Sequence, residues 1–515
     1  MPTRNSEKLQ KRSDCYFAEN KLGEDIARRS LHGGVVSIGA RVVNALVQIG
    51  SVVLLARLLS PEDYGLVGMA YAVVGIVPLL LDLGTRDAVV QQPCITPGEI
   101  SALFWINFAL GCAFAALLAA SSPLIAHFFG EPRLTLVTLV SSLTLVVVPL
   151  SYQHQALLCR AMMYREWAMI AIGANMVGTA VAVAMAFRGC GYWALVVRPA
   201  VASVVTVLGA WSKCCWLPGR PTFTVGVKQM LKFGSRWIVF SGTDFAGRYG
   251  DRIAIGYACG AIGLGYYQKA CLVYENCLDL VSTALYPVAI AGFSKLRNNL
   301  EQLWRSWAKA ISTLAFFAMP AFGILAVSSQ DVIVLALGKK WENASVLLSI
   351  LALRGIPHVV ERTVAWLHIA SGRAERLMRW GVIATVAQLA ALFAGLPFGT
   401  IGIAWSYVLC MYIMFLPAIA YGGRPVGIGA MKVIRAVGPQ MIGALAAVAL
   451  GFLLRVTVFA TTPMLIRTML LSISFSVAYV LIVVGLFRVR TPLQVGHAVL
   501  RAGAGQSLRF GTRPV

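Results

Sequence analysis

The 515-residue chain is hydrophobic at 58% of its positions, charged at 13%, and carries a formal net charge of +23. Its mean hydropathy of +0.75 excludes a soluble enzyme, because so little polar surface cannot cover a protein in water. The apolar blocks are about 20 residues long, the length of a membrane-crossing helix and about twice that of a transmembrane β-strand. We therefore expect an all-α, polytopic membrane protein.

The apolar blocks predict about 14 transmembrane helices. Acidic residues interrupt three of them, with Asp251 in the seventh, Glu275 in the eighth and Glu361 in the tenth. The predicted helices lie at 35–56, 66–84, 101–121, 134–157, 167–187, 191–211, 235–257, 264–290, 309–327, 345–370, 378–396, 400–421, 438–456 and 464–487.

Lysine and arginine gather on one side of these helices, in the segments on the same side as the N-terminus. This asymmetry predicts that both termini are cytoplasmic, because positively charged loops stay inside. The net charge is then explained by topology and by contact with anionic lipid headgroups, and we expect no nucleic-acid partner. About 30 polar residues precede the first apolar block, so no cleavable signal peptide is predicted.

The 11 cysteines are scattered and show no spacing that is typical of a metal site. We expect them to be small apolar side chains, with no structural disulfide and no bound metal.

The second part of the chain repeats the first at an offset of about 200 residues. Leu31 matches Leu231, for example, and Gly65 matches Gly265. Each copy holds six predicted helices, so the two copies enter the membrane in the same orientation and a pseudo-two-fold axis along the membrane normal should relate them. The predicted organisation is an N-terminal tail 1–30, an N-lobe 31–211, a linker 212–232, a C-lobe 233–421, an additional helix pair 422–487 and a C-terminal tail 488–515.

Polar side chains form a stripe along the first predicted helix, and the repeat carries an equivalent stripe. Residues at spacings of three or four positions share one helix face. A charge at the bilayer centre costs about 2.5 to 3.5 kcal/mol, so the stripes predict a polar path inside the protein. The first stripe is Ser37, Arg41, Asn44, Gln48 and Ser51, and the second is Ser241, Asp244, Arg248 and Asp251.

Further stripes occur in the eighth and tenth helices, and together they give two groups of candidates. Arginine suits phosphate because its planar fork donates paired hydrogen bonds, and amides suit sugar hydroxyls. The candidates for substrate binding are Arg41, Asn44, Gln48, Arg248, Arg252, Lys269, Arg354 and Arg362. The candidates for ion coupling are Asp244, Asp251, Glu275, Asp279 and Glu361. An alternative is that pairs such as Asp244 with Arg248, or Glu361 with Arg362 or His358, only fix helix packing.

At the exit of the first predicted helix, residues 55–66 have the sequence Leu-Ala-Arg-Leu-Leu-Ser-Pro-Glu-Asp-Tyr-Gly-Leu, and Asp82-Leu83-Gly84 ends the second. Together with the duplicated layout, these segments resemble the polysaccharide transporter family of Wzx-type flippases, in the exopolysaccharide and colanic-acid exporter branch of the multidrug, oligosaccharidyl-lipid and polysaccharide superfamily. The family motif has a structural role here, starting a helix with Ser60 as cap and Pro61 in its first turn.

The resemblance implies a membrane transporter and no enzyme. It implies flipping of undecaprenyl-pyrophosphate-linked oligosaccharide repeat units from the cytoplasmic to the periplasmic leaflet of the bacterial inner membrane, for exopolysaccharide or lipopolysaccharide biosynthesis. Transport would proceed by alternating access through a cationic central cavity. The implied partners are the lipid-linked substrate, membrane lipids, a polysaccharide polymerase and chain-length regulator proteins.

The energy source for this transport has two candidate forms. The chain has no G-x-x-x-x-G-K-[ST] loop, so we expect neither ATP hydrolysis nor another cofactor. A negative cytoplasm favours outward movement of an anion by about 2.3 kcal/mol per charge per 100 mV. Antiport of H⁺ or Na⁺ through the carboxylates is the other candidate, and we prefer it.

Two other functions are compatible with a polytopic chain. A drug or metabolite cation antiporter of the same superfamily has twelve helices, whereas this chain has an additional pair and its stripes are rich in cations. A polysaccharide polymerase or ligase needs a substantial external loop for its catalytic groups, but the longest external connection predicted here, 328–344, is only about 17 residues long.

Overall fold

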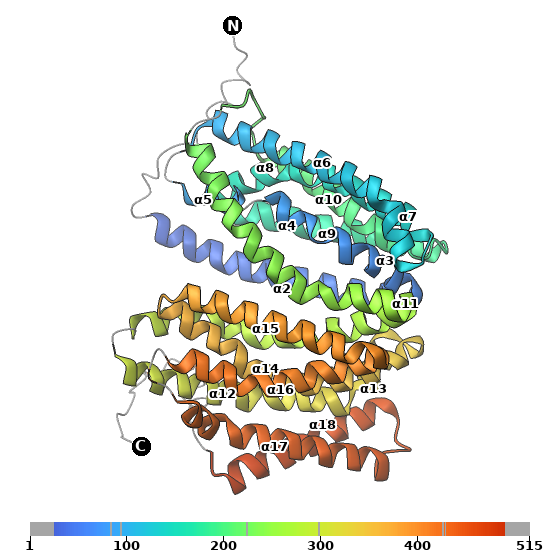
Figure 1. The fold of residues 1–515 in the computed structure, drawn as a ribbon, viewed down its shortest axis with the longest axis vertical. Coiled ribbons are helices and arrows are strands. Elements are labelled where there is room, and N and C mark those ends of the chain that lie inside the picture. Colours follow the sequence, from blue (N-terminus) through green and yellow to red (C-terminus); the bar gives the residue numbers. More distant parts are fainter. Residues whose placement is uncertain are drawn as a thin grey trace. The chain divides into compact units, whose positions relative to one another are not determined.

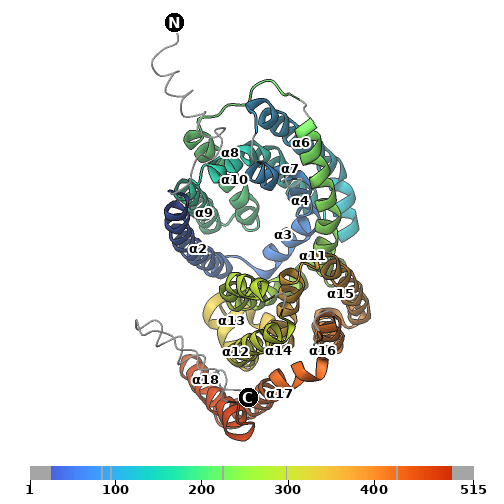
Figure 2. The same cartoon turned by 90° about the vertical axis from the view of Figure 1, so that its left-hand side faces the viewer.

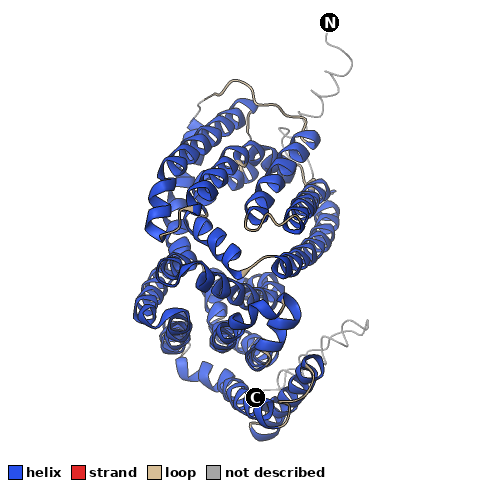
Figure 3. Ribbon diagram, turned by 90° about the vertical axis from the view of Figure 1, so that its right-hand side faces the viewer, coloured by secondary structure: helices blue, strands red, loops and turns tan. Residues whose placement is uncertain are grey.

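The protein is all-helical, as the sequence predicts. The computed structural model describes residues 25–82, 85–92, 95–222, 225–296, 299–424, 427 and 429–489. Within these ranges every regular element is a helix (Figures 1 and 3). Contacts between residues divide the chain into two compact units, Met1–Gly265 and Tyr266–Val515.

The first unit is built from helices α2 to α10 and the beginning of α11. Helix α9 lies beside α2 and α10, and α7 lies beside α6 (Figure 2). The helices are α2 (Asp25–Leu58), α3 (Pro61–Val74), α4 (Val77–Asp82), α5 (Thr85–Gln91), α6 (Pro97–Phe129), α7 (Arg133–Val147), α8 (Pro149–Arg160), α9 (Tyr164–Phe187), α10 (Trp193–Lys213) and α11 (Val225–Lys295).

The second unit holds the remainder of α11 and the helices that follow. Helix α14 packs against both α12 and α16, while α17 packs against α12 and α18. The helices are α12 (Leu300–Val327), α13 (Ser329–Leu337), α14 (Glu342–Ala370), α15 (Ala374–Gly395), α16 (Gly399–Gly423), α17 (Ala430–Thr457) and α18 (Met464–Val480). A π-helical turn, Leu481–Leu486, extends α18.

The helices are long and apolar enough to cross a membrane. The described residues include nine such segments, and one of them, Glu375–Gly423, contains two predicted helices joined end to end. Large apolar side chains on them face outward, with Leu124 70%, Phe187 71% and Val456 73% exposed. Such a surface is stable against acyl chains and not against water. The polytopic fold with about 14 membrane helices is therefore confirmed.

Four predicted helices differ in detail from the observed ones. The second is broken at the turn Gly75–Ile76, because Pro78 in the first turn of α4 has no backbone N–H to continue the ladder of α3. Pro149 divides the fourth into α7 and α8 for the same reason. The seventh and eighth join directly at Gly260, whose φ of 69° suits glycine.

The compact units do not divide at the predicted linker, 212–232. Helix α11 already begins at Val225, and the division lies farther along the same helix, at Gly265. Helix α11 is kinked at Gly260, without an intervening loop, and its residues up to Gly265 belong to the first unit. The lobe boundaries inferred from the repeat stay a prediction.

The predicted helix start at Ser60 is confirmed and has a counterpart at Thr96. The Ser60 hydroxyl accepts a hydrogen bond from the Asp63 backbone N–H at 3.2 Å, and the Asp63 carboxylate accepts one from the Ser60 backbone N–H at 2.9 Å. Thr96 and Glu99 form the same reciprocal pair at the start of α6. In both places proline occupies the first turn, and each box satisfies donors that the helix leaves unpaired.

Two glycines one repeat apart allow α3 and α11 to touch. A Cβ atom on Gly65 would lie 1.6 Å from the Ala261 carbonyl oxygen, and one on Gly265 would lie 2.0 Å from the Pro61 carbonyl oxygen. The contact is reciprocal: residue 65 meets 261, and residue 265 meets 61. A two-fold relation between the two segments produces this pattern, which supports the predicted repeat independently of sequence matches.

We expect Gly65→Ala and Gly265→Ala to destabilise the protein by about 1–3 kcal/mol each, because the backbones must separate to admit a methyl group. Thermal unfolding of the purified protein in detergent checks this. The matched control is Gly173→Ala in α9, where a Cβ meets nothing within 4 Å. Unfolding temperatures equal to that of the control would contradict the close contact.

A buried carboxylate links the last two helices, α17 and α18, to α13 within the second unit. Asp331 of α13 is fully buried and accepts two hydrogen bonds from Arg467 of α18, one of them from Nε to Oδ2 at 3.0 Å. Arg455 of α17 lies 3.7 Å from the same carboxylate. The 328–344 connection, predicted as a plain external loop, is thus largely helical and structural. The sequence analysis did not identify Asp331.

Asp331→Asn should destabilise the second unit by about 3–5 kcal/mol, because two partly buried guanidinium groups lose their only described carboxylate partner. The measurement is again thermal unfolding in detergent. Glu375→Gln is the control: its ion pair with Arg379 is exposed, with side chains 77% and 69% accessible, and such pairs contribute little. Equal unfolding temperatures for both variants would show that the buried cluster is not stabilising.

Candidate functional site

Helix α14 carries an arginine, a histidine and a glutamate on one face, inside the second unit. Arg354, His358 and Glu361 line a cavity of about 40 Å³, and Pro357 lies in the same stretch of the helix. Helices α15 and α16 close the cavity. Their contribution is Trp380, Ala384 and Gln388 from α15, with Tyr407, Cys410, Met411 and Met414 from α16.

Glu361 and His358 belong to a chain of polar contacts. The Trp380 indole N–H donates to Glu361 Oε1 at 3.3 Å, and Glu361 Oε2 lies 4.0 Å from His358 Nε2. The other histidine nitrogen, Nδ1, lies 2.6 Å from the Tyr274 hydroxyl of α11. Three helices therefore position one carboxylate beside one imidazole, an arrangement that can hold or pass a proton.

Arg354 is a partly buried cation that lacks an ion-pair partner among the described residues. Its guanidinium lies over the Tyr407 ring, 5.2 Å from the ring centre. Its Nε is buried without a hydrogen-bond partner, and no carboxylate in the described part of the chain is within ion-pair distance of it. A cation in a membrane helix is costly unless something compensates it. The aromatic face compensates only partly, so the site is suited to an anion.

The stripe predicted along the tenth helix is divided between two environments. Arg362 does not face the cavity: it forms an ion pair with Asp279 of α11 at 2.7 Å, and both side chains are partly exposed. The alternative pairing of Glu361 with Arg362 is therefore wrong, because Arg362 lies on the neighbouring side of the helix. The pairing of Glu361 with His358 is present at the outer limit of an ion-pair distance.

The other candidates of the second unit lie apart from this cavity. Lys269 is 4% exposed, with its Nζ 5.7 Å from the centre of the Trp341 ring. Glu275 is exposed. Neither lines the cavity.

In the first unit, three of the described candidates contact other residues of the same unit. Asn175 of α9 donates to the Asn44 amide oxygen at 2.9 Å, while Gln48 is exposed. The buried Asp251 accepts from the Arg252 backbone N–H at 2.7 Å, and the Arg252 guanidinium lies 4.5 Å from the centre of the Tyr249 ring.

Three candidates lie outside the part whose side chains are described: Arg41, Asp244 and Arg248. The shared central cavity and the roles given to all these residues stay predictions.

Helix α8 carries a polar cluster that was not predicted from the sequence. Gln153 and His154 are fully buried and Gln155 nearly so. Gln155 accepts a hydrogen bond from Arg86 at 3.1 Å, and His154 stacks on Trp211 with ring centres 4.7 Å apart. The signal was present in the sequence, because Tyr-Gln-His-Gln at 152–155 interrupts an apolar block.

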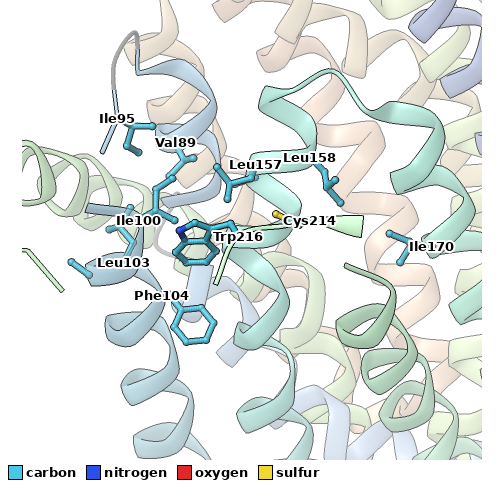
Figure 4. Packing of buried hydrophobic residues seen from close by; sticks show 12 residues of the cluster. Val89, Ile95, Ile100, Leu103, Phe104, Leu157, Leu158, Ile170, Cys214 and Trp216 are labelled. Atoms are coloured by element: carbon cyan, nitrogen blue, oxygen red, sulfur yellow. The ribbon is translucent and has the colours of Figure 1, made fainter. Parts of the chain in front are cut away.

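An apolar cluster adjoins these residues of α8. Trp216 lies among Ile100, Leu103 and Phe104 of α6 and Leu157 of α8 (Figure 4). The Trp216 ring also packs edge-on against His154, with ring centres 5.2 Å apart. The polar side chains of α8 are thereby held rigidly in the first unit.

Membrane-crossing helices and an internal polar cavity define a multi-pass membrane protein of the transporter class. The fold is similar to that of "Lipid II flippase MurJ, inward closed conformation", with a TM-score of 0.70 and 14% identity over 89% of this chain and 99% of that one. It is also similar to an inward-facing multidrug resistance MATE family transporter, with a TM-score of 0.57 and 15% identity over 76% of this chain and 98% of that one.

The chain belongs to the family of polysaccharide biosynthesis proteins, which matches residues 54–346. The lipopolysaccharide biosynthesis protein WzxC of Escherichia coli (strain K12) is 22% identical over 75% of this chain and 80% of its own length. The succinoglycan biosynthesis transport protein ExoT of Rhizobium meliloti (strain 1021) is 26% identical over 67% of this chain and 70% of its own length. The teichuronic acid biosynthesis protein TuaB of Bacillus subtilis (strain 168) is 25% identical over 66% and 71%.

Arg354→Ala should reduce polysaccharide export at least tenfold while the protein still inserts into the membrane, because the cavity loses its cation. Arg354→Lys should restore export only in part, since an ammonium lacks the planar fork. Surface polysaccharide in a complemented deletion strain, normalised to membrane-inserted protein, is the measurement. Arg379→Ala, an exposed arginine on α15, is the control. Normal export by Arg354→Ala would remove this residue from the mechanism.

Proposed function

We propose that this protein is a flippase for an oligosaccharide linked to undecaprenyl pyrophosphate, moving it from the cytoplasmic to the periplasmic leaflet of the bacterial inner membrane. Membership of the polysaccharide biosynthesis family supports the pathway, and the fold likeness to a lipid II flippase supports the mode of transport. The observation that carries the proposal is Arg354, a cation inside a membrane-spanning unit with no carboxylate of the described residues within ion-pair distance.

The chemistry of such a cargo fits the lining of the cavity. A pyrophosphate crossing about 30 Å of hydrocarbon needs a cation and hydrogen-bond donors in place of water. Arg354 supplies the charge, and Gln388 supplies an amide for sugar hydroxyls. Trp380 and Tyr407 offer aromatic rings of the kind against which sugar rings lie.

The size of the cavity implies movement. A volume of about 40 Å³ holds roughly one to three water molecules and no sugar. Admission of a headgroup therefore requires α15 or α16 to move away from α14. Two of these helices contain an internal proline, Pro357 in α14 and Pro417 in α16. Because proline has no backbone N–H to donate, the helix lacks one hydrogen bond there and bends more easily at that position. We take this structure as a closed state of an alternating-access cycle.

In the proposed orientation both termini are cytoplasmic, as the distribution of lysine and arginine predicts. The end of the second unit that contains α13 then faces the periplasm. A polysaccharide polymerase and a chain-length regulator that receive the flipped unit are the proposed protein partners.

The main alternative, a cation antiporter for drugs or metabolites, is disfavoured by charge. An organic cation needs a carboxylate with free acceptor positions, whereas Glu361 already accepts the Trp380 indole N–H and lies 4.0 Å from His358 Nε2. Arg354 has no carboxylate of the described residues within ion-pair distance. A polymerase or ligase is disfavoured because the 328–344 connection is occupied by α13 and a buried Asp331. It has no freely placed catalytic groups of the kind that such enzymes need.

Deletion of the gene tests the function directly. The expected result is loss of surface polysaccharide together with lipid-linked units that accumulate on the inner leaflet, out of reach of reagents added outside spheroplasts. Accumulation on the outer leaflet would instead indicate a polymerase or ligase. Reconstituted vesicles with a defined lipid-linked sugar then show whether the protein alone moves it.

Glu361 is the proposed coupling group. It lines the same cavity as Arg354, close to an imidazole and hydrogen-bonded to an indole N–H, so its protonation would change the net charge of the cavity. Exchange of a proton for the anionic headgroup would link the two movements. Asp244, Asp251, Glu275 and Asp279 remain candidates for the same role.

In vesicles, Glu361→Gln should abolish the stimulation of flipping by an imposed pH gradient, because an amide cannot release a proton. Stimulation by an imposed voltage should persist, since the headgroup remains charged. The matched control is Glu375→Gln on the exposed face of α15. If Glu361→Gln responds to the pH gradient as wild type does, Glu361 is not the coupling group. If the wild-type protein responds to a sodium gradient and not to a pH gradient, the coupling ion is Na⁺.

A further inference from the structure

A second cavity, larger than the first, lies near the N-terminal end of α14. It has a volume of about 370 Å³, within the range of about 300–1,000 Å³ that small-molecule sites occupy. It is formed where α13 and α14 begin, where α16 begins and where α17 ends. The transport mechanism proposed above does not use it. Its polar lining is Ser329, Gln330, Ser345, Ser349 and Arg455.

Arg455 brings a surplus positive charge to this cavity. Arg467 alone satisfies Asp331 with two hydrogen bonds, so the charge of Arg455, whose Nη2 lies 3.7 Å from the same carboxylate, is not needed for neutrality. Arg455 donates to the Val327 carbonyl and, at 2.7 Å, to the Gln330 amide oxygen. Of the five N–H donors of a guanidinium, two are engaged, which leaves three without a hydrogen-bond partner among the described residues.

The nearby polar groups hold the guanidinium in place. Gln330 accepts from Arg455 and donates its own amide to Glu342 at 2.7 Å. Glu342 is the carboxylate on the far side of Gln330 and does not line the cavity. The Ser349 hydroxyl is fixed on the Ala326 carbonyl at 2.8 Å. A guanidinium that is already held in position binds an anion with little loss of side-chain entropy.

The mouth of the cavity is apolar and lies on the outer, lipid-facing surface. Val346 is 50%, Ile401 49%, Trp405 45% and Phe452 37% exposed. These side chains come from α14, α16 and α17 and surround a single cation with hydroxyl and amide groups. A tryptophan beside an arginine at a helix end is typical of the membrane interface, where an amphipathic ligand places its head and its tails.

We propose that this cavity binds an anionic phospholipid, with the headgroup phosphate on Arg455 and the acyl chains along Ile401, Trp405 and Phe452. The charge favours a lipid with net negative charge over a zwitterionic one. The apolar rim distinguishes a lipid from a free phosphate ion, for which it offers nothing. In the orientation proposed above, the lipid belongs to the outer leaflet, and it would fasten α17 to α13, α14 and α16.

Native mass spectrometry of the purified full-length protein in detergent tests this. The probes are dioleoyl phosphatidylglycerol, dioleoyl phosphatidylcholine and inorganic phosphate. We expect retained phosphatidylglycerol adducts at concentrations at least tenfold below those needed for phosphatidylcholine, and no competition by phosphate. Arg455→Gln should remove this preference, whereas Arg379→Gln on the exposed face of α15 should keep it.

A second variant covers the case in which Arg455→Gln fails to fold. Ile401→Trp leaves the arginine and its hydrogen bonds intact but fills the apolar mouth, and it should weaken phosphatidylglycerol binding at least fivefold. Equal binding of the two lipids by wild type, or unchanged binding in both variants, would overturn the proposal. Displacement of the lipid by inorganic phosphate would show a simple anion site instead. Since binding is read without transport, a failed flippase assay leaves this result intact.

Discussion

The cost of placing charge in hydrocarbon organises this protein. In water a stray arginine or aspartate is inexpensive, but within a membrane helix each one requires a partner, a polar cavity or a ligand. The second unit shows all three solutions. Asp331 and Arg467 satisfy each other. Glu361 contacts Trp380 and His358 inside a cavity, and Arg354 has an aromatic face but no described carboxylate. The last condition is the one that packing does not explain, and it makes Arg354 the centre of the proposed substrate site.

The internal repeat is the second constraint. Glycines at 65 and 265 permit a reciprocal contact between α3 and α11 that any side chain would prevent. Capping boxes at Ser60 and Thr96 begin helices at defined residues. Local rules of this kind set where helices start and how closely they approach, while lipid-facing leucine and valine need only be apolar. The functional groups are then carried on a frame with few strictly required residues.

Much of the fold follows from the sequence because hydrophobic length and helix caps are local properties. The apolar blocks and the start of α3 after Ser60 are examples. The spacing of Arg354, His358 and Glu361 also predicted that these three side chains share one face of α14, and all three line the cavity. Arg362, from the same stripe, does not line this cavity but pairs with Asp279, and its role in substrate binding stays a prediction. Asp331 was missed because its partners, Arg455 and Arg467, are more than a hundred residues away in sequence. Gln153 and His154 were not predicted although they interrupt an apolar block, because the prediction relied mainly on charged residues and these side chains are neutral.

The side chains that line the α14 cavity bear on how the protein could accommodate different substrates. Met411 and Met414 line it on the α16 side, next to Cys410. Methionine is unbranched and polarizable, and it adapts to irregular shapes without a fixed geometry. The proposed substrate site therefore combines one fixed cation, which would recognise the charged headgroup, with flexible thioethers that would adapt to its shape. Under this proposal a change in the sugars of the substrate is accommodated by new side-chain conformations of Met411 and Met414, and Arg354 stays the same.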